Sequence, residues 1–263
     1  MSKGVVTAII IIVFILLIGG GWLLLSGNHN QAGQYSSMNN PSNGASANGT
    51  IYMSFKDAAV NMGNVSAVDM TVDKIYVHSE SQGWVTVSTN PQTFSLLNLK
   101  ASGAAQLMAT ATVAADTYDQ AWFHISGATV TETGKTAKAA ALPSGDFKMA
   151  GTLKVTGGTS SVATFDVLAD QSLHKTSKSE FVFAPVVNFE SRENAMVGVN
   201  SYNILTITGG TVDSNTSAGM DSNGEVKANF KLDANVNLQI NGGVINVLGA
   251  AGTTTGVSGS AGY

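Results

Sequence analysis

Cysteine is absent from the chain, which excludes disulfide bonds, thiolate metal sites and attachment through a lipidated cysteine. A protein without disulfides depends on its hydrophobic core for stability. The 263 residues are enough for one or two domains. A folded region of about 200 residues buries enough apolar area to be stable by packing alone.

Charged residues are also scarce. Asp, Glu, Lys and Arg make up 11% of the chain, the formal net charge at pH 7 is −4, and Arg192 is the single arginine. A protein that binds nucleic acid normally carries a basic face that neutralises phosphates. We therefore expect no nucleic-acid partner.

The common catalytic motifs are missing as well. The sequence contains no GxSxG elbow, P-loop or HExxH motif. Its histidines are His29, His78, His124 and His174, and none has the HxH or HxxxH spacing of paired metal ligands. We expect His29 to lie in a linker and the others at strand ends or half-buried. The sequence thus predicts a protein that is not an enzyme and holds no cofactor or metal.

Two groups of carboxylates are weaker candidates for a functional site. Asp213, Asp221 and Glu225 flank a loop of oxygen-bearing side chains, which are the ligands that calcium prefers. The D-x-D-x-D-G spacing is missing, which favours a solvated polar loop. Asp116 and Asp119 are interpreted as turn residues, because aspartate stabilises turns by accepting hydrogen bonds from nearby backbone amides.

Three large aromatic residues, Trp84, Trp122 and Phe123, suggest another kind of site. Aromatic rings on the surface of a sheet can stack against sugar rings. One face of each strand must supply the core, however, so burial is the simpler interpretation of these residues. Sugar binding remains the alternative.

The longest apolar run lies at the start of the chain. It extends from Val5 to Leu25 without a charged residue. A helix of this length covers about 30 Å, the thickness of the hydrocarbon core of a bilayer. Lys3 precedes the run and the next Lys or Arg is Lys56, which predicts that the N-terminus lies in the cytoplasm. We predict a single-pass membrane helix over residues 1–25, with membrane lipid as its partner and the remainder of the chain extracellular.

Two other interpretations of this run stay open. A cleaved secretion signal normally has a shorter apolar core of about 7–15 residues, followed by a small-residue cleavage site. Alternatively, Lys3-Gly4 before the apolar run resembles the class III signal of archaeal pilins and archaellins, which is cut after the glycine. Cleavage after Gly4 would leave the helix on the mature chain, as in a subunit of an extracellular filament.

A polar segment follows the apolar run. Residues 26–50 are rich in Gly, Asn and Ser and carry no charge, so we predict a flexible stalk. Asn-x-Ser/Thr sequons occur at Asn48, Asn64 and Asn215. They are candidate glycosylation sites, consistent with a location outside the cell.

Beyond the stalk the pattern is that of β-strands. Short segments rich in threonine and β-branched residues are separated by turn residues, which is typical of an antiparallel β-sandwich. The expected fold class is all-β. We predict a main domain over residues 51–190, a smaller C-terminal β section over 191–248 and a low-complexity tail over 249–263. The segments expected to be strands are 70–78, 84–87, 91–99, 121–130, 151–156, 163–168, 180–188, 202–208, 225–232 and 237–247.

Two local patterns allow finer predictions. Gly-Gly pairs at 157–158, 209–210 and 242–243 stand between β-type residues. A type I′ turn needs positive φ at both central positions, so each pair predicts a tight hairpin. In the segment 70–78, strict alternation divides the side chains between two faces. One face would carry Val72, Lys74, Tyr76 and His78, and the other Thr71, Asp73, Ile75 and Val77.

Five blocks of sequence carry a family resemblance. In order along the chain they are AVDMTVDKIYVH (67–78), GWVTV (83–87), FSLLNL (94–99), TYDQ (117–120) and FVFAPVV (181–187). Their order and spacing, over about residues 51–190, resemble DUF4382, a domain of unknown function found in archaeal and bacterial envelope proteins. The segment 54–59 keeps part of the strand end with which family members usually start. The resemblance implies a β-sandwich at the cell surface and supplies no activity, so no catalytic residue is carried over.

Together these observations favour a non-catalytic cell-surface protein with a structural or adhesive role. It would be a membrane-anchored β-sandwich that associates with itself or with surface partners. One alternative is a pilin-like filament subunit assembled through the N-terminal helix. The other is an envelope module that binds glycans or calcium.

Overall fold

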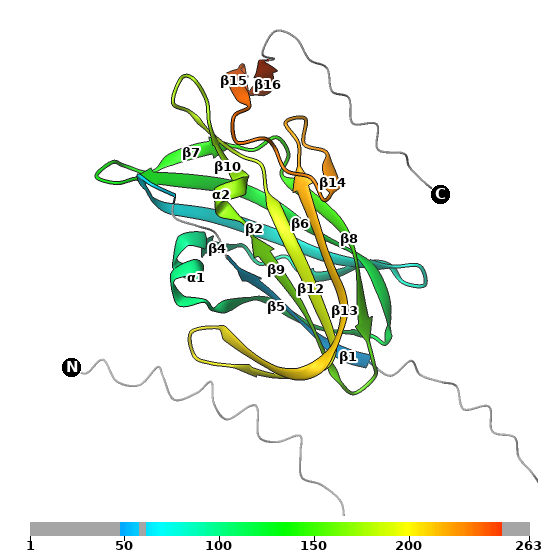
Figure 1. Cartoon of the computed structure of the whole chain (residues 1–263). Coiled ribbons are helices and arrows are strands. Elements are labelled where there is room, and N and C mark those ends of the chain that lie inside the picture. Colours follow the sequence, from blue (N-terminus) through cyan, green and yellow to red (C-terminus); the bar gives the residue numbers. More distant parts are fainter. Residues whose placement is uncertain (1–47, 58–61, 249–263) are drawn as a thin grey trace, which may run out of the picture. The chain divides into compact units, whose positions relative to one another are not determined.

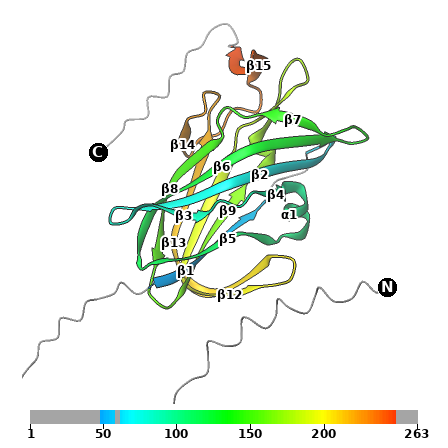
Figure 2. The same cartoon turned by 180° about the vertical axis from the view of Figure 1, so that it is seen from behind.

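The computed structural model describes residues 48–57 and 62–248 (Figure 1 and Figure 2). The predicted membrane helix, the cleavage position after Gly4, most of the predicted stalk and the tail 249–263 lie outside the described residues. Among the described residues, none of the helical segments has the length and hydropathy of a membrane span. The anchoring of the chain stays a prediction.

Most of the described chain forms two β-sheets (Figure 1). Sheet A has the strand order β12-β9-β1-β5-β13-β14. Because β12 and β13 also pair with each other, the strands β12, β9, β1, β5 and β13 form a closed circuit of hydrogen-bonded neighbours. The strands of sheet A are β1 (Asn48–Lys56), β5 (Ala105–Ala114), β9 (Ser160–Val167), β12 (Val186–Val199), β13 (Ile204–Met220) and β14 (Val226–Ala228).

Sheet B has the order β10-β11-β7-β6-β2-β3, with β4 paired to β2 and β8 paired to β6. Its strands are β2 (Val65–Ser79), β3 (Gly83–Ser88), β4 (Gln92–Ser95), β6 (Asp116–Glu132), β7 (Lys138–Ala141), β8 (Asp146–Val155), β10 (Leu173–Lys175) and β11 (Phe181–Phe183). The remaining elements are α1 (Leu96–Ser102), α2 (Ala169–Ser172) and the hairpin of β15 (Asn237–Asn241) and β16 (Val244–Leu248).

Phenylalanines from both sheets meet in the core. The ring centroid of Phe55 on β1 lies 4.9 Å from that of Phe94 and 5.4 Å from that of Phe123. Phe123 stacks on Phe147 at 5.0 Å and meets Phe165 of β9 at 5.5 Å. All five side chains are fully buried, and such contacts stabilise the fold beyond the burial of area alone. The predicted all-β sandwich is confirmed by this packing of one sheet on the other.

Two strand pairs are parallel, whereas the sequence predicted an antiparallel sandwich. β9 runs parallel to β1, and β11 runs parallel to β7. The first pair arises because the chain leaves sheet B at the end of β8 and crosses to sheet A, where it continues beside β1 in the same direction. The N–H of Gly158 donates to the carbonyl of Asn48 (2.8 Å), and the N–H of Thr50 donates to that of Thr159 (2.9 Å). These bonds hold the crossing against β1.

Only one of the three Gly-Gly pairs makes the predicted hairpin. Residues 242–243 have φ of 58° and 83° and join the paired residues Asn241 and Val244. The pair 157–158 makes the crossing between sheets, because β8 and β9 belong to different sheets. The pair 209–210 lies inside β13, close to Asn194 of β12, where the regular pairing of the two strands is interrupted. The two hairpin predictions were wrong because pairing partners decide what a flexible glycine pair does.

A β-bulge at Asp73 changes which residues of β2 share a face. Between Val72 and Lys74 the partner strand β6 advances by one residue only, so Asp73 has no residue opposite. An extra residue shifts the alternation of side chains by one. Val72 therefore points into the core, whereas Tyr76 lies on the outer face. The prediction that these two share a face was wrong, because the bulge leaves no local sign in the sequence.

The C-terminal part of the described chain completes the sandwich. The predicted boundary between residues 190 and 191 falls inside β12, and β13 and β14 belong to sheet A. The β15–β16 hairpin packs Leu238 and Ile245 against Val182 of β11. The predicted strand 91–99 is divided into β4 and α1, and the predicted strand 225–232 is reduced to β14.

Candidate functional site

The outer face of sheet B carries a row of large side chains in register. Thr86 of β3 lies opposite Tyr76 of β2. Tyr76 lies opposite Trp122 of β6, which in turn lies opposite Lys148 of β8. Trp84 precedes Thr86 by two residues and so lies on the same face of β3. We call Tyr76, Trp84, Trp122 and Lys148 the aromatic platform; their four strands run side by side in Figure 2.

The indole of Trp122 has close neighbours on adjacent strands. The ring of Tyr76 stacks on it with a centroid distance of 4.6 Å and an interplanar angle of 18°. The Nζ atom of Lys148 lies 4.6 Å from its centroid. Trp84 meets it edge-on at 5.8 Å and is itself 41% exposed. Stacking and cation–π contacts therefore fix the rings and leave Trp84 open to a ligand.

Polar groups border the platform. The Nε1–H group of Trp122 donates to Oδ1 of Asp146 at 3.1 Å. Nδ1 of His78 lies 2.7 Å from Oδ1 of Asp119, and its ring centroid lies 5.1 Å from that of Trp84. An apolar ring face beside hydrogen-bonding groups matches the two sides of a sugar, which has apolar C–H faces and a hydroxyl edge.

The three aromatic residues predicted to be buried have different positions. Phe123 is fully buried in the core, as predicted. Trp84 and Trp122 lie on the opposite face of the same sheet and belong to the platform. The alternative prediction, a stacking surface, therefore applies to the two tryptophans only.

The histidines within the described residues do not form a metal site. His78 and His124 are half-buried on the outer face of sheet B, and Nδ1 of His124 lies 2.6 Å from Oδ1 of Asp73. His174 is buried in β10, and burial lowers its pKa. His29 lies outside the described residues, among which no three His, Asp or Glu side chains could hold a metal ion together.

The carboxylates that suggested calcium binding have a lysine as their partner. Oδ1 of Asp221 accepts hydrogen bonds from the N–H groups of Asn223 (2.9 Å) and Glu225 (3.0 Å). Nζ of Lys227 lies 2.6 Å from Asp221 and 3.2 Å from Glu225. Burial raises the pKa of Asp221, but its hydrogen bonds, that from Lys227 foremost, outweigh burial and the net shift is downward. Asp213 lies eight residues earlier, inside β13, where burial raises its pKa.

Asp116 and Asp119 lie in β6 rather than in a turn. The hydroxyl of Ser81 donates to Asp116 at 2.5 Å, and hydrogen bonds from Ser81 and Ser79 hold the pKa of this carboxyl below its ordinary value. Tyr118, between the two aspartates, is buried in the core. Asp116 thus binds the β2–β3 turn, whereas Asp119 borders the platform.

The three sequons are at exposed positions. Asn48 begins β1, Asn64 lies in the turn before β2, and Asn215 lies in β13. Each side chain is accessible from solvent. Glycosylation of these residues stays a prediction.

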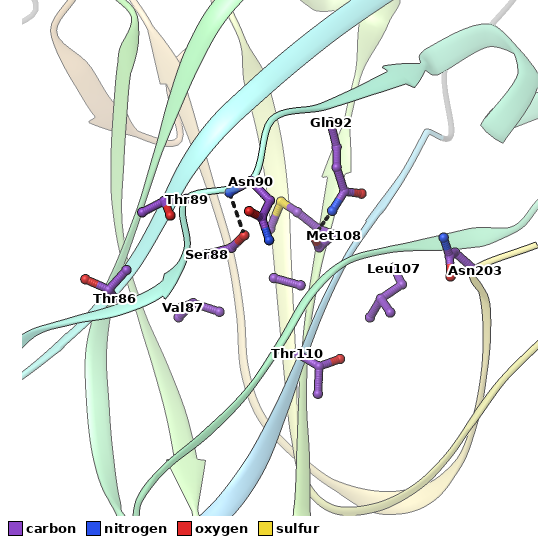
Figure 3. Close-up of a pocket in the computed structure, with 11 residues that line it drawn as sticks. Thr86, Val87, Ser88, Thr89, Asn90, Gln92, Leu107, Met108, Thr110 and Asn203 are labelled. Atoms are coloured by element: carbon purple, nitrogen blue, oxygen red, sulfur yellow. Dashed lines mark hydrogen bonds between the residues drawn. The ribbon is translucent and has the colours of Figure 1, made fainter. Parts of the chain in front are cut away.

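A crevice of about 520 Å³ opens beside the platform, between the edge strand β3 and strand β5 (Figure 3). Thr86 belongs to its wall and also lies opposite Tyr76, so the crevice and the platform adjoin. No sequence pattern predicted this crevice, because its walls come from segments far apart in the chain. Its polar lining residues are Thr86, Ser88, Thr89, Asn90, Gln92, Thr110 and Asn203.

A family model for a domain of unknown function, DUF4382, matches residues 48–185. The chain belongs to the DUF4382 family. This confirms the resemblance seen in the sequence. The DUF4382 match spans β1 to β11 and includes the whole platform; it ends one residue before β12, although β12 and β13 complete sheet A. No curated protein and no solved structure matches the chain.

Proposed function

We propose that this DUF4382 protein is a non-catalytic adhesive protein of the cell surface that binds carbohydrate through the aromatic platform. The observation that carries the proposal is the exposed ring of Trp84 beside the stacked pair of Tyr76 and Trp122. These rings lie on the face of sheet B that is not needed for the core. Large aromatic side chains on a protein surface that are not required for folding mark binding sites.

The charged groups nearest the rings suit binding rather than reaction. Lys148 interacts with the indoles of Trp84 and Trp122. Asp146 accepts a hydrogen bond from Trp122, and Asp119 is paired with His78. Lys148 and Asp146 therefore orient rings of the platform, and Asp119 orients the His78 ring at its border.

The proposed location rests on the N-terminal sequence. The uncharged run over residues 5–25 predicts a membrane helix, and the distribution of lysines predicts that the sandwich lies outside the cell. A glycan-binding surface on an extracellular domain would serve attachment to other cells, to an envelope polymer or to a host surface.

A glycan array tests the proposal. The full-length chain, purified in detergent, is expected to retain a defined subset of glycans. Trp84→Ala should weaken that binding about tenfold, because one stacking ring is lost, and should leave the unfolding temperature almost unchanged.

Met196→Ala is the matched control, since it removes another large apolar side chain, 70% exposed, from β12. Its binding should equal that of the wild type. The proposal fails if the wild-type chain retains no glycan, or if Trp84→Ala binds as well as Met196→Ala.

A filament subunit is the second candidate function. It is favoured by exposed apolar side chains near the turn of the β12–β13 hairpin, where Met196 is 70% and Tyr202 81% exposed. Exposed apolar groups of this kind support self-association. Mass spectrometry of the native N-terminus decides the question: a chain that starts at Val5 supports processing after Gly4, whereas one that starts at Met1 or Ser2 refutes it.

A further inference from the structure

The crevice between β3 and β5 has a neutral, polar lining. Its eleven lining residues include four with hydroxyl groups and three with amide groups, and none is charged. The volume, about 520 Å³, is in the range of small-ligand sites. A charged ligand would find no counter-ion there, whereas an uncharged ligand with many hydroxyl groups would find both donors and acceptors.

Several of the polar side chains that line the crevice are free to form hydrogen bonds with a ligand. Within the described part of the chain, the side chains of Asn90, Thr110 and Asn203 form no hydrogen bond to protein groups. The amide of Gln92 is fixed, because its Nε2 donates to the carbonyl of Met108 at 2.9 Å. Figure 3 shows Asn90 and Gln92 on one side of the crevice and the strand of Leu107 to Thr110 on the other.

A peptide that binds as an additional β-strand is not a suitable ligand for this crevice, although two strand edges border it. The N–H of Leu107 already donates to the carbonyl of Asn203 at 2.7 Å, and the carbonyl of Met108 accepts from Gln92. The β1–β5 register also shifts at Met108, because Ala109 pairs with Met53 and Leu107 with the next residue of β1. Occupied backbone groups and an irregular edge prevent the addition of a strand.

The crevice lies within reach of a ligand that stacks on the platform. Thr86 lines the crevice and is two residues from Trp84 on the same face of β3, a separation of about 7 Å. An oligosaccharide longer than one ring therefore reaches both features.

We propose that the crevice is a second subsite of the glycan-binding surface, and that the ligand is an uncharged oligosaccharide. One ring stacks on Trp84, and the hydroxyl groups of a following ring enter the crevice and bind the amides of Asn90 and Gln92. This inference rests on the proposed function. It adds the ligand class, neutral and at least two rings long.

The test uses the full-length chain on a printed array of neutral hexose, N-acetylhexosamine and uronate-containing oligosaccharides of one to six rings. Asn90→Ala is expected to lower the affinity for neutral oligomers about five- to tenfold, through the loss of hydrogen bonds to the ligand. It should leave the weak binding of single rings unchanged. Asn90 is exposed, and among the described residues its side chain has no hydrogen-bond partner. The bond from its backbone N–H to the hydroxyl of Ser88 is unaffected by the substitution, so the variant keeps the fold.

Asn98→Ala is the matched control, because Asn98 is an exposed asparagine on α1 outside the crevice. It should bind every array member as the wild type does. The inference is overturned if Asn90→Ala equals this control, or if uronate oligomers bind as tightly as neutral ones. In either case a loss of binding in Trp84→Ala would leave the proposed function standing, whereas an array without any wild-type binding refutes both.

Discussion

Sheet B has two faces built from the same strands, and their side chains differ in kind. On β6, Phe123 points inward and is fully buried among other phenylalanines, whereas its neighbour Trp122 points outward to Tyr76 and Lys148. The inner face holds apolar groups that fill volume. The outer face holds aromatic rings bordered by charged and hydrogen-bonding groups. The inner face therefore provides the stability of the sandwich, and the outer face provides a surface with a specific chemistry.

The largest loss of stability is expected from a substitution on the inner face of sheet B. Phe123→Ala removes a ring that contacts Phe55, Phe147 and Phe165, and should lower the free energy of unfolding by about 3–5 kcal/mol. Denaturant unfolding of the full-length chain in detergent measures this loss. Phe123→Leu, which retains most of the volume, should lose much less; equal losses would contradict the packing described for this site.

A smaller effect on the same face is expected from added volume. A Cβ atom at Gly151 of β8 would lie 2.5 Å from the ring of Phe189, so Gly151→Ala should cost about 1–3 kcal/mol of unfolding free energy. The adjacent Ala150 is exposed on the outer face, and Ala150→Ser should change stability by less than about 0.5 kcal/mol. Thermal unfolding of both variants tests whether the two faces differ as described.

Trp122→Ala should lower the free energy of unfolding less than Phe123→Ala does, although it removes the larger side chain. It loses the stack with Tyr76 and the cation–π contact with Lys148, about 1–2 kcal/mol together. Denaturant unfolding beside Phe123→Ala gives the comparison. A loss as large as that of Phe123→Ala would show that the outer face contributes to the core, and would remove the distinction between the two faces.

The smallest effect on stability is expected from the protonation of a single carboxyl group at low pH. Hydrogen bonds from Lys135 and Lys175 lower the pKa of Glu132, at the end of β6, from 4.5 to about 2. A carboxyl with a lowered pKa stabilises the fold above its ordinary pKa, and this stabilisation is lost as the pH falls from about 4.5 to about 2. The unfolding temperature of Glu132→Gln should thus depend less on pH in this range than that of the wild type. Glu180→Gln, which replaces an exposed glutamate, should keep the wild-type dependence.

The sequence predicted correctly those features that depend on residues close together in the chain. The β-branched segments predicted an all-β sandwich, and the glycine pair at 242–243 predicted a true hairpin. β5 was missed because its sequence, AQLMATATVA, is mostly alanine and threonine and has weak alternation. The bulge at Asp73 was missed because it depends on the register with β6.

The candidate site could be predicted in part. Trp84 and Trp122 were recognised as possible stacking residues, but the sequence did not show that they face away from the core. Tyr76 and Lys148 join them only through the register of β2, β6 and β8. The crevice needs Asn203 of the β12–β13 turn beside residues of β3 and β5 that lie about a hundred positions earlier in the chain. Such long-range pairings are set by the fold as a whole and not by neighbouring residues.

The position of β1 determines how the domain would respond to mechanical load. β1 is hydrogen-bonded along its length to β5 on one side and to β9 on the other. A pull applied at Asn48 along the strand loads the hydrogen bonds of both ladders in shear, so the two ladders resist together instead of opening one bond at a time. Tension applied from the N-terminal side would thus enter sheet A through a strand that is paired on both of its edges, whereas the aromatic platform lies on sheet B.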